Sequence, residues 1–251
     1  MQNIRKTHLK VAVFILTSLL FFSPYLLAQS SSTPDFSGLW FPRGGFGRIT
    51  PTPLPFTAEA QQMYDKYMQE FTPNDDPGRF CIKPGLPRAI WGAPFAIEIH
   101  QTEREITIFY EGYFMYRKIY IEGYDRPEPI LHTRMGYSAG HWEGDVLVIK
   151  TTHLRDYPYM MRTPNSSAAM VNERMYIEMR DNRDGGKDKW LVDELTLEDP
   201  ALYTEPVKIS GAIKWSPETP IMEYSCSETI WDDYLLEKGL EPPDVDSLIK
   251  E

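Results

Sequence analysis

The feature that most constrains the fold is a series of short segments in which apolar and polar residues alternate. In the segment that begins at Phe95, Ile97 and Ile99 alternate with Glu98 and His100. A period of two is typical of a β-strand with one buried face. We expect strands at 35–40, 95–100, 106–111, 113–121, 140–143, 145–151, 171–180, 190–198, 207–215 and 221–226.

The short connections between these segments favour consecutive hairpins, such as the turn at residues 102–104. Helices do not alternate with the strands, which argues against a parallel sheet. An antiparallel meander of this size protects its edges by closing. The sequence therefore predicts an all-β fold with one or two short helices, an antiparallel up-and-down barrel of lipocalin-like shape. A two-sheet β-sandwich is the alternative.

Two segments have helical signals. Thr57 is a suitable N-cap for a helix over 57–71, in which apolar residues recur every three or four positions, and Pro73 follows its end. This helix has a single apolar face and is expected to pack on something larger. A second, short helix is expected over 228–238.

The N-terminal 28 residues have the layout of a secretory signal peptide. Arg5, Lys6 and Lys10 precede an apolar stretch that is broken by Pro24 and ends at Ala28. An uncleaved membrane anchor is the alternative, and no later run is long enough to span a bilayer. We therefore expect a periplasmic or secreted protein, with a single β-rich domain at 29–251 and a C-terminal tail at 240–251.

Charge and cysteine content limit the partners. The formal net charge is −10, and such a surface repels phosphate backbones, so nucleic acid is not expected to bind. The chain has two cysteines, Cys81 and Cys226, which outside the cytoplasm most simply form one disulfide. A reactive thiol or a metal ligand is the alternative, although neither cysteine has a histidine at ligand spacing.

The segment Gly136-Tyr137-Ser138-Ala139-Gly140 matches the G-x-S-x-G pattern of serine hydrolases. That mechanism needs a helix after the serine, whereas here a hairpin follows, with Glu143-Gly144 as its expected turn. Ser138 is therefore interpreted as part of a strand entry. No histidine pair has helical metal-ligand spacing, so neither a metal ion nor a cofactor is expected. His141 is either a general base or ligand contact, or an exposed strand residue.

Four charged residues interrupt the apolar alternation: Glu111, Arg117, Glu173 and Arg174. Glu111 and Arg117 flank the Gly112 turn and are expected to meet across it. Glu173 and Arg174 are neighbours, so only one of them can face the lumen. These charges form either a buried ion pair or solvated face, or a polar cluster that orients a ligand in an aromatic cavity. Residues 157–161 then form either a lid or a loop packed on the barrel end.

Several motifs resemble those of a family of exported bacterial proteins without an assigned activity. The matching segments are 35–40, 81–87, 136–151, 171–174, 198–204 and 223–226. They include the hairpin signature G-x-S-x-G-x-W-E-G-D, of which residues 140–145 are the most specific part. The chain departs from the family at Val146, where threonine is usual, and at 151–154. The resemblance implies export and a β-rich fold, and carries over no catalytic residue.

Together these observations predict an extracytoplasmic β-barrel that binds a small apolar or aromatic ligand. The candidate ligand-binding residues are Tyr137, His141, Trp142, Glu173 and Arg174. The first alternative is a cofactor-independent isomerase, hydratase or lyase that uses Glu111, Arg117 or His141. The second is a structural or interaction protein of the cell envelope. The sequence does not indicate an oligomeric state.

Overall fold

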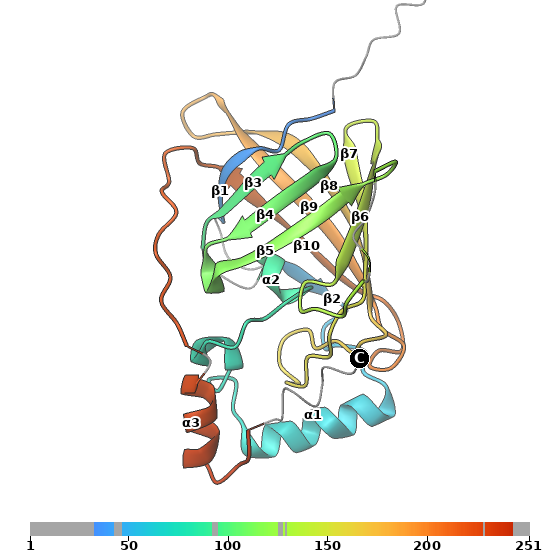
Figure 1. Ribbon diagram of the computed structural model, residues 1–251, viewed down its shortest axis with the longest axis vertical. Coiled ribbons are helices and arrows are strands. Elements are labelled where there is room, and N and C mark those ends of the chain that lie inside the picture. The colour runs from blue at the N-terminus through green and yellow to red at the C-terminus, as the bar shows by residue number, and fades with distance from the viewer. Residues whose placement is uncertain are drawn as a thin grey trace, which may run out of the picture. The chain divides into compact units, whose positions relative to one another are not determined.

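A computed structural model describes residues 33–42, 47–91, 95–124, 128, 130–227 and 229–242, without the Trp91 side chain. Figure 1 draws this part of the chain as a coloured ribbon. The predicted signal peptide at 1–28 lies outside the described residues, as do residues 243–251 of the predicted tail. The described residues belong to one compact unit, Ser32–Glu251.

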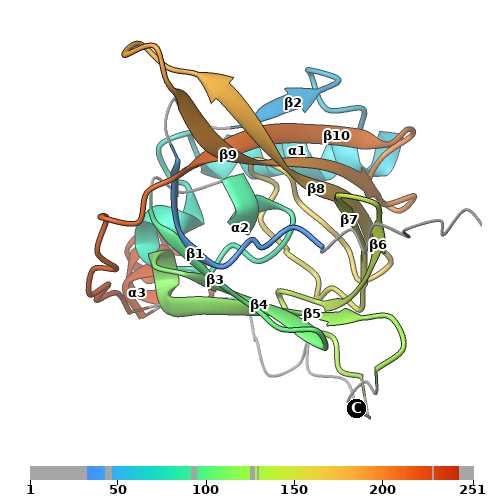
Figure 2. The same ribbon diagram turned by 90° about the horizontal axis from the view of Figure 1, so that it is seen from above.

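The strands of this unit form one sheet that closes on itself. Their order is β1-β3-β4-β5-β6-β7-β8-β9-β10-β2, and a further pairing of β1 with β10 completes the ring (Figures 1 and 2). The strands are β1 (Gly38–Pro42), β2 (Arg48–Thr50), β3 (Ile97–Gln101), β4 (Glu105–Tyr110), β5 (Met115–Ile121), β6 (Tyr137–Glu143), β7 (Val146–Thr152), β8 (Met170–Asp181), β9 (Lys187–Glu198) and β10 (Val207–Trp215). The predicted all-β barrel is confirmed.

One pair of neighbours in the ring is parallel. β5 and β6 pair in parallel through Ile119 with Ser138, Tyr120 with Ala139, and Ile121 with Gly140. The ring of described strands consists of β1 and β3 to β10, with β2 outside it on β10. An odd number of strands cannot close with every pair antiparallel, because the direction must alternate around the ring. The strand order is therefore that of an up-and-down barrel, with one parallel pair.

Two local predictions were wrong in detail. Glu143 pairs with Val146, so the hairpin turn consists of Gly144 and Asp145 rather than Glu143-Gly144, and Gly144 adopts a φ of +61° there. Residues 221–226 form no strand. This segment lies outside the ring that the pairing of β1 with β10 closes, and the Met222 N–H donates to the Glu111 carboxylate.

Both predicted helices are present. α1 (Ala58–Glu70) is capped by Thr57, whose hydroxyl accepts a hydrogen bond from the Ala60 N–H at 3.1 Å. α3 (Thr229–Glu237) is the predicted C-terminal helix. α1 and α3 lie at the same end of the barrel (Figure 1). Three short helices were not predicted: α2 (Arg88–Trp91), η1 (Pro77–Phe80) and η2 (Gly112–Phe114). Among the described residues, no helix combines the length and the apolar composition needed to cross a membrane.

Inward-facing side chains fill the barrel. One buried cluster lies between the strands and includes Trp40, Ile119 and Leu147, with Ala89 of α2 packed into it. Two further clusters lie toward α1 and α3. Tyr157, Tyr159, Met160 and Met161 are buried in these two clusters. The segment 157–161 is therefore a loop packed at the barrel end, which was one of its two predicted roles.

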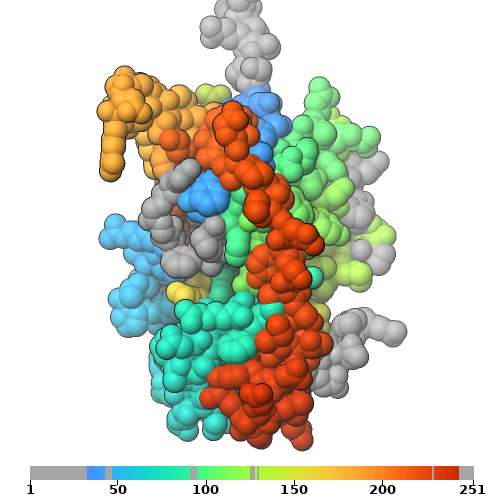
Figure 3. Space-filling model, turned by 90° about the vertical axis from the view of Figure 1, so that its left-hand side faces the viewer, coloured from blue at the N-terminus to red at the C-terminus, as the bar shows by residue number. Residues whose placement is uncertain are grey.

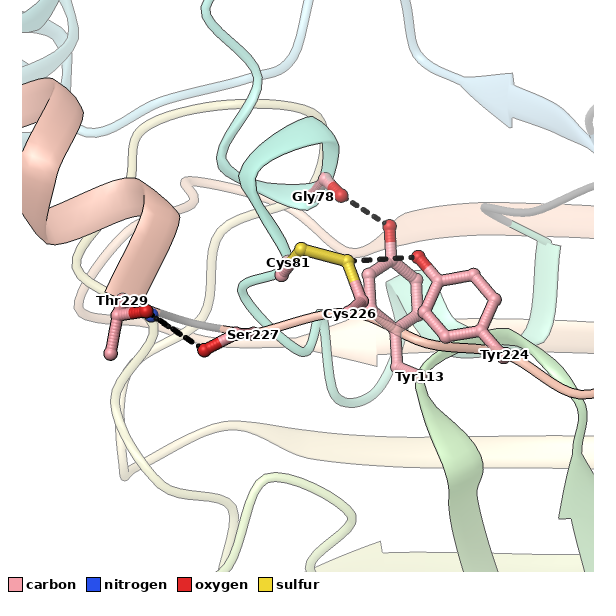
Figure 4. The surroundings of a disulfide bond; sticks show 7 residues. All are labelled: Gly78, Cys81, Tyr113, Tyr224, Cys226, Ser227 and Thr229. Carbon is pink, nitrogen blue, oxygen red and sulfur yellow. Dashed lines mark hydrogen bonds between the residues drawn. A yellow bond between two sulfur atoms is a disulfide. The ribbon is translucent and has the colours of Figure 1, made fainter.

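The predicted disulfide is present and holds the C-terminal segment to the barrel. Cys81 and Cys226 are joined, with their Cα atoms 5.5 Å apart (Figure 4). Beside the bond, the Tyr113 hydroxyl donates to the Gly78 carbonyl at 2.6 Å. The chain after β10 runs over the outer surface toward this bond and α3 (Figure 3).

Candidate functional site

The barrel interior contains a buried arginine with an ordered set of partners. On β5, alternate side chains face inward, which places Arg117 in the lumen. Its Nη1 donates to Glu173 Oε1 at 2.9 Å, and its Nη2 bonds to Glu173 Oε2. Its Nε donates to Ser138 Oγ at 2.9 Å, and Nη2 also donates to Thr151 Oγ1 at 2.8 Å. The arginine is thus fixed by a charge and two hydroxyls.

The predicted contact between Glu111 and Arg117 was wrong. Glu111 Oε2 instead accepts a hydrogen bond from the backbone N–H of Met222 at 2.9 Å. Glu111 lies before η2, next to the C-terminal segment, whereas Arg117 points into the lumen toward β8. The prediction used closeness in sequence, but the nearest carboxylate to an inward-facing arginine is decided by the strands around the ring.

Asp193 on β9 is a second buried carboxyl in this region. Burial, and then the negative charge of Glu173, raise the pKa of the Asp193 carboxyl well above its ordinary value. Its Oδ1 has no hydrogen-bond partner among the described residues. Two carboxyls share the lumen with one guanidinium, so a protonated Asp193 keeps the cluster close to neutral.

The space beside Asp193 is small. A cavity of about 20 Å³ is lined by Tyr110, Arg117, Asp193 and apolar residues of β3, β4, β8, β9, β10 and α2. A cavity needs roughly 10–15 Å³ of space open to the centre of a water molecule in order to hold one. This cavity thus has room for water but not for an aromatic ligand.

Ser138 belongs to this interior. It faces inward on β6, is buried, and lies 2.8 Å from Thr151 Oγ1 in addition to accepting from Arg117. A β-strand continues after it as far as Glu143. The interpretation of the G-x-S-x-G segment as a strand entry is confirmed, and the hydroxyl serves to hold Arg117.

A much larger cavity lies on the outer side, where β5 and β6 separate beyond their short parallel pairing. We call it the β5–β6 cleft; its volume is about 610 Å³. Most of its lining residues are aromatic or apolar. They are Phe114, Met115, Tyr116, Tyr120, Ile130, Leu131, Met135 and Tyr137, together with Lys83, Arg117, Lys118, Thr133, Arg134 and Gly136.

A row of ring contacts begins in the cleft and continues beyond its lining. Tyr120 and Tyr137 stack with their ring centroids 5.5 Å apart and an interplanar angle of 17°. Tyr137 meets His153 edge-on at 6.5 Å, and His153 lies 5.1 Å from His132. Offset or edge-on packing of this kind is favourable for aromatic pairs. The stacked Tyr120 and Tyr137 rings therefore form a preformed aromatic surface in the cleft.

The predicted ligand-binding residues do not converge. Tyr137 lines the cleft. Trp142 packs against Phe36 with a centroid distance of 5.3 Å. His141 and Arg174 are on the outer surface, 3.4 Å and 2.9 Å from the Glu143 carboxylate. Glu173 is in the lumen, so the prediction that Glu173 and Arg174 face opposite sides is confirmed.

The same geometry separates the predicted catalytic residues. Arg117 is buried in the lumen, His141 is exposed on β6, and Glu111 binds the Met222 backbone. They do not form a common cluster. Within the described part of the chain, no three His, Cys, Asp or Glu side chains are grouped so that they could hold a metal ion.

The sequence did not predict that Lys83, Lys118, Tyr120 and Arg134 line the cleft. Lys118 and Tyr120 alternate with the inward-facing residues of β5. This alternation could have predicted that both side chains lie on the outer face of the strand. The segment 130–136 has no periodicity that could have shown its position.

No protein-family model matches the chain, and no curated protein is significantly similar to it in sequence. The resemblance to the exported family therefore stays a prediction that rests on its motifs.

Proposed function

We propose that the protein is an extracytoplasmic β-barrel that binds a small aromatic or apolar molecule in the β5–β6 cleft. The observation that carries this proposal is the cleft itself, with a volume of about 610 Å³ and a lining rich in aromatic and apolar side chains. Small-molecule sites commonly measure about 300–1,000 Å³ and combine such a lining with a few polar groups.

Comparison with two other cavities among the described residues supports this location. The lumen cavity is about 20 Å³. A second outer groove of about 610 Å³, on β2 and β7 to β10, is lined mainly by polar and charged residues such as Arg48, Glu194 and Lys208. Burial of apolar surface is the main driving force for binding an apolar ligand. Such a ligand should therefore bind more tightly in the β5–β6 cleft than in the polar groove.

The binding test uses a neutral dye, N-phenyl-1-naphthylamine, whose fluorescence rises in apolar surroundings. The wild-type protein should show saturable binding. Leu131→Asp places a charge in the cleft at a side chain that is 67% exposed, and should weaken binding at least tenfold. Leu236→Asp is the matched control, since Leu236 is 60% exposed on α3, and should bind as the wild type does. Equal binding by Leu131→Asp and the wild type would reject the cleft as the site.

The extracytoplasmic part of the proposal rests on the sequence of residues 1–28 and is consistent with the Cys81–Cys226 disulfide. Expression of the full chain in a Gram-negative host, followed by fractionation and N-terminal sequencing, tests it. The expected product is a shortened chain in the periplasm or medium. A full-length chain in the cytoplasm would contradict export.

A structural or interaction role in the cell envelope is the second candidate, and the filled lumen favours it. It predicts no saturable binding of any small aromatic compound. The dye titration therefore separates the two candidates.

A further inference from the structure

We propose that the ligand of the β5–β6 cleft is an anion, a small aromatic acid with a carboxylate, sulfonate or similar group. This inference rests on the proposed function and adds the charge of the ligand. Its basis is the set of charged residues in the lining: Lys83, Arg117, Lys118 and Arg134 are cationic, and no described lining residue is acidic.

This distribution contrasts with the chain as a whole. The protein contains 36 acidic and 26 basic residues, so an average patch of its surface is acidic. The polar groove on β2 and β7 to β10 mixes both signs, with Arg48, Arg174 and Lys208 beside Glu173 and Glu194. A concave surface lined by one sign of charge concentrates ions of the opposite sign.

Two of the cations already have carboxylate partners. Arg117 is paired with Glu173, and Lys118 Nζ lies 2.8 Å from Glu105 Oε1. Neither pair includes Arg134 or Lys83. Arg134 Nη1 donates to the Lys83 carbonyl at 2.7 Å, which ties the guanidinium to the cleft wall. A guanidinium has five N–H donors in a planar fork that suits a carboxylate or sulfonate.

Each wall of the cleft combines a cation with a tyrosine. On β5, Lys118 and Tyr120 face outward together, because they are two residues apart on a strand. On the opposite wall, a turn at 133–136 with Gly136 at a φ of +64° precedes Tyr137. Arg134 and Tyr137, whose ring stacks on Tyr120, thus line the same cleft.

This arrangement suits a molecule with an aromatic ring and an acidic group. The ring packs on the Tyr120–Tyr137 surface, where aromatic contacts add to apolar burial. The acidic group accepts charge-assisted hydrogen bonds from Arg134 and Lys118. A neutral molecule of the same shape makes only the first set of contacts and is bound more weakly.

The test compares two dyes that share the anilinonaphthalene rings and differ by one sulfonate. These are 1-anilinonaphthalene-8-sulfonate and the neutral N-phenyl-1-naphthylamine. The anionic dye should bind at least tenfold more tightly at low salt, and this preference should shrink in high salt because ions screen exposed charges. Competition by 2-naphthoate, but not by 2-naphthalenemethanol, extends the result to a carboxylate.

Variants locate the effect. Arg134→Gln should weaken binding of the anionic dye about tenfold and leave the neutral dye unchanged, which also shows that the cleft is intact. Lys208→Gln in the polar groove is the control and should leave the affinity for both dyes unchanged. Equal affinity for both dyes, or an unchanged preference in Arg134→Gln, would overturn the anion inference and leave the proposed function standing. Absence of binding by either dye would reject the proposed function itself.

Discussion

Arg117 on β5 and Glu173 on β8 are paired inside the barrel, although β6 and β7 lie between their strands. Ser138 on β6 and Thr151 on β7 bridge that interval. Each hydroxyl accepts a hydrogen bond from Arg117, and the two hydroxyl oxygens lie 2.8 Å apart. Four successive strands thus contribute one polar side chain each to a single row on the inner wall. The row thereby connects β5 with β8, two strands that do not pair directly with one another.

Removal of one partner from this row should be costly. Glu173→Leu leaves the Arg117 guanidinium buried without its counter-charge, and we expect the free energy of unfolding to fall by about 3–5 kcal/mol. Urea denaturation followed by circular dichroism measures this. The double variant Arg117→Met/Glu173→Leu removes both charges and should recover most of the loss.

The control for this experiment is the exposed pair between Arg174 and Glu143. Glu143→Gln should leave the stability nearly unchanged, since water and salt screen surface pairs. A Glu173→Leu variant as stable as Glu143→Gln would show that the buried row does not support the fold.

Asp193 should make the stability depend on pH. Its folded-state pKa is raised, first by burial and then by Glu173, whereas the unfolded value is about 3.9. Above about pH 4 the unfolded chain releases this proton and the folded protein retains it. The contribution of Asp193 to stability is therefore lost as the pH rises toward the folded pKa, with a slope of up to about 1.4 kcal/mol per pH unit.

Asp193→Asn tests this directly. The amide does not titrate and can donate to Glu173, while Arg117, Glu194 and Tyr110 remain as the other charged or titratable neighbours. The variant should become more stable than the wild type as the pH is raised from 4 to 7, measured by urea denaturation at each pH. Parallel pH curves for the two proteins would contradict a raised pKa at this position.

The disulfide should stabilise the C-terminal segment most. Cys81 and Cys226 are 145 residues apart, and a chain-entropy model assigns a loop of this length about 5 kcal/mol, with measured losses commonly 2–5 kcal/mol. The double variant Cys81→Ser/Cys226→Ser should lower the free energy of unfolding by about 2–5 kcal/mol. Limited proteolysis should then cut first within 216–242, while the barrel resists. Uniform digestion of both regions would argue against a local tether.

Gly136 and Gly144 form a matched pair for testing a close backbone approach. Both have positive φ values, +64° and +61°, so alanine strains both, at about 1–2 kcal/mol each. A Cβ on Gly136 would also lie 2.5 Å from the Thr152 carbonyl oxygen, whereas one on Gly144 meets nothing within 4 Å. Thermal unfolding should show Gly136→Ala to be less stable than Gly144→Ala by about 1–3 kcal/mol. Equal losses of stability in the two variants would show that the backbone near Thr152 can move away from a Cβ at position 136.

The local features of the chain were predictable because their causes lie within a few residues. The alternation at Ile97 and Ile99 shows which side of a strand is buried, and Thr57 marks the start of α1. The cysteine pairing followed from there being two cysteines. The segment 221–226 forms no strand despite its strand-like pattern, because a strand also needs a partner strand, and that partner is not encoded within the segment.

The tertiary structure alone decided which strands are neighbours, and with it the candidate site. Alternation places Arg117 inward but cannot show that Glu173, rather than Glu111, lies across from it. It also cannot show that β5 and β6 run parallel, which follows from closing an odd number of strands. Hydrophobic periodicity is a property of a short segment, whereas ring closure and the cleft beside β5 arise from contacts between segments far apart in the chain.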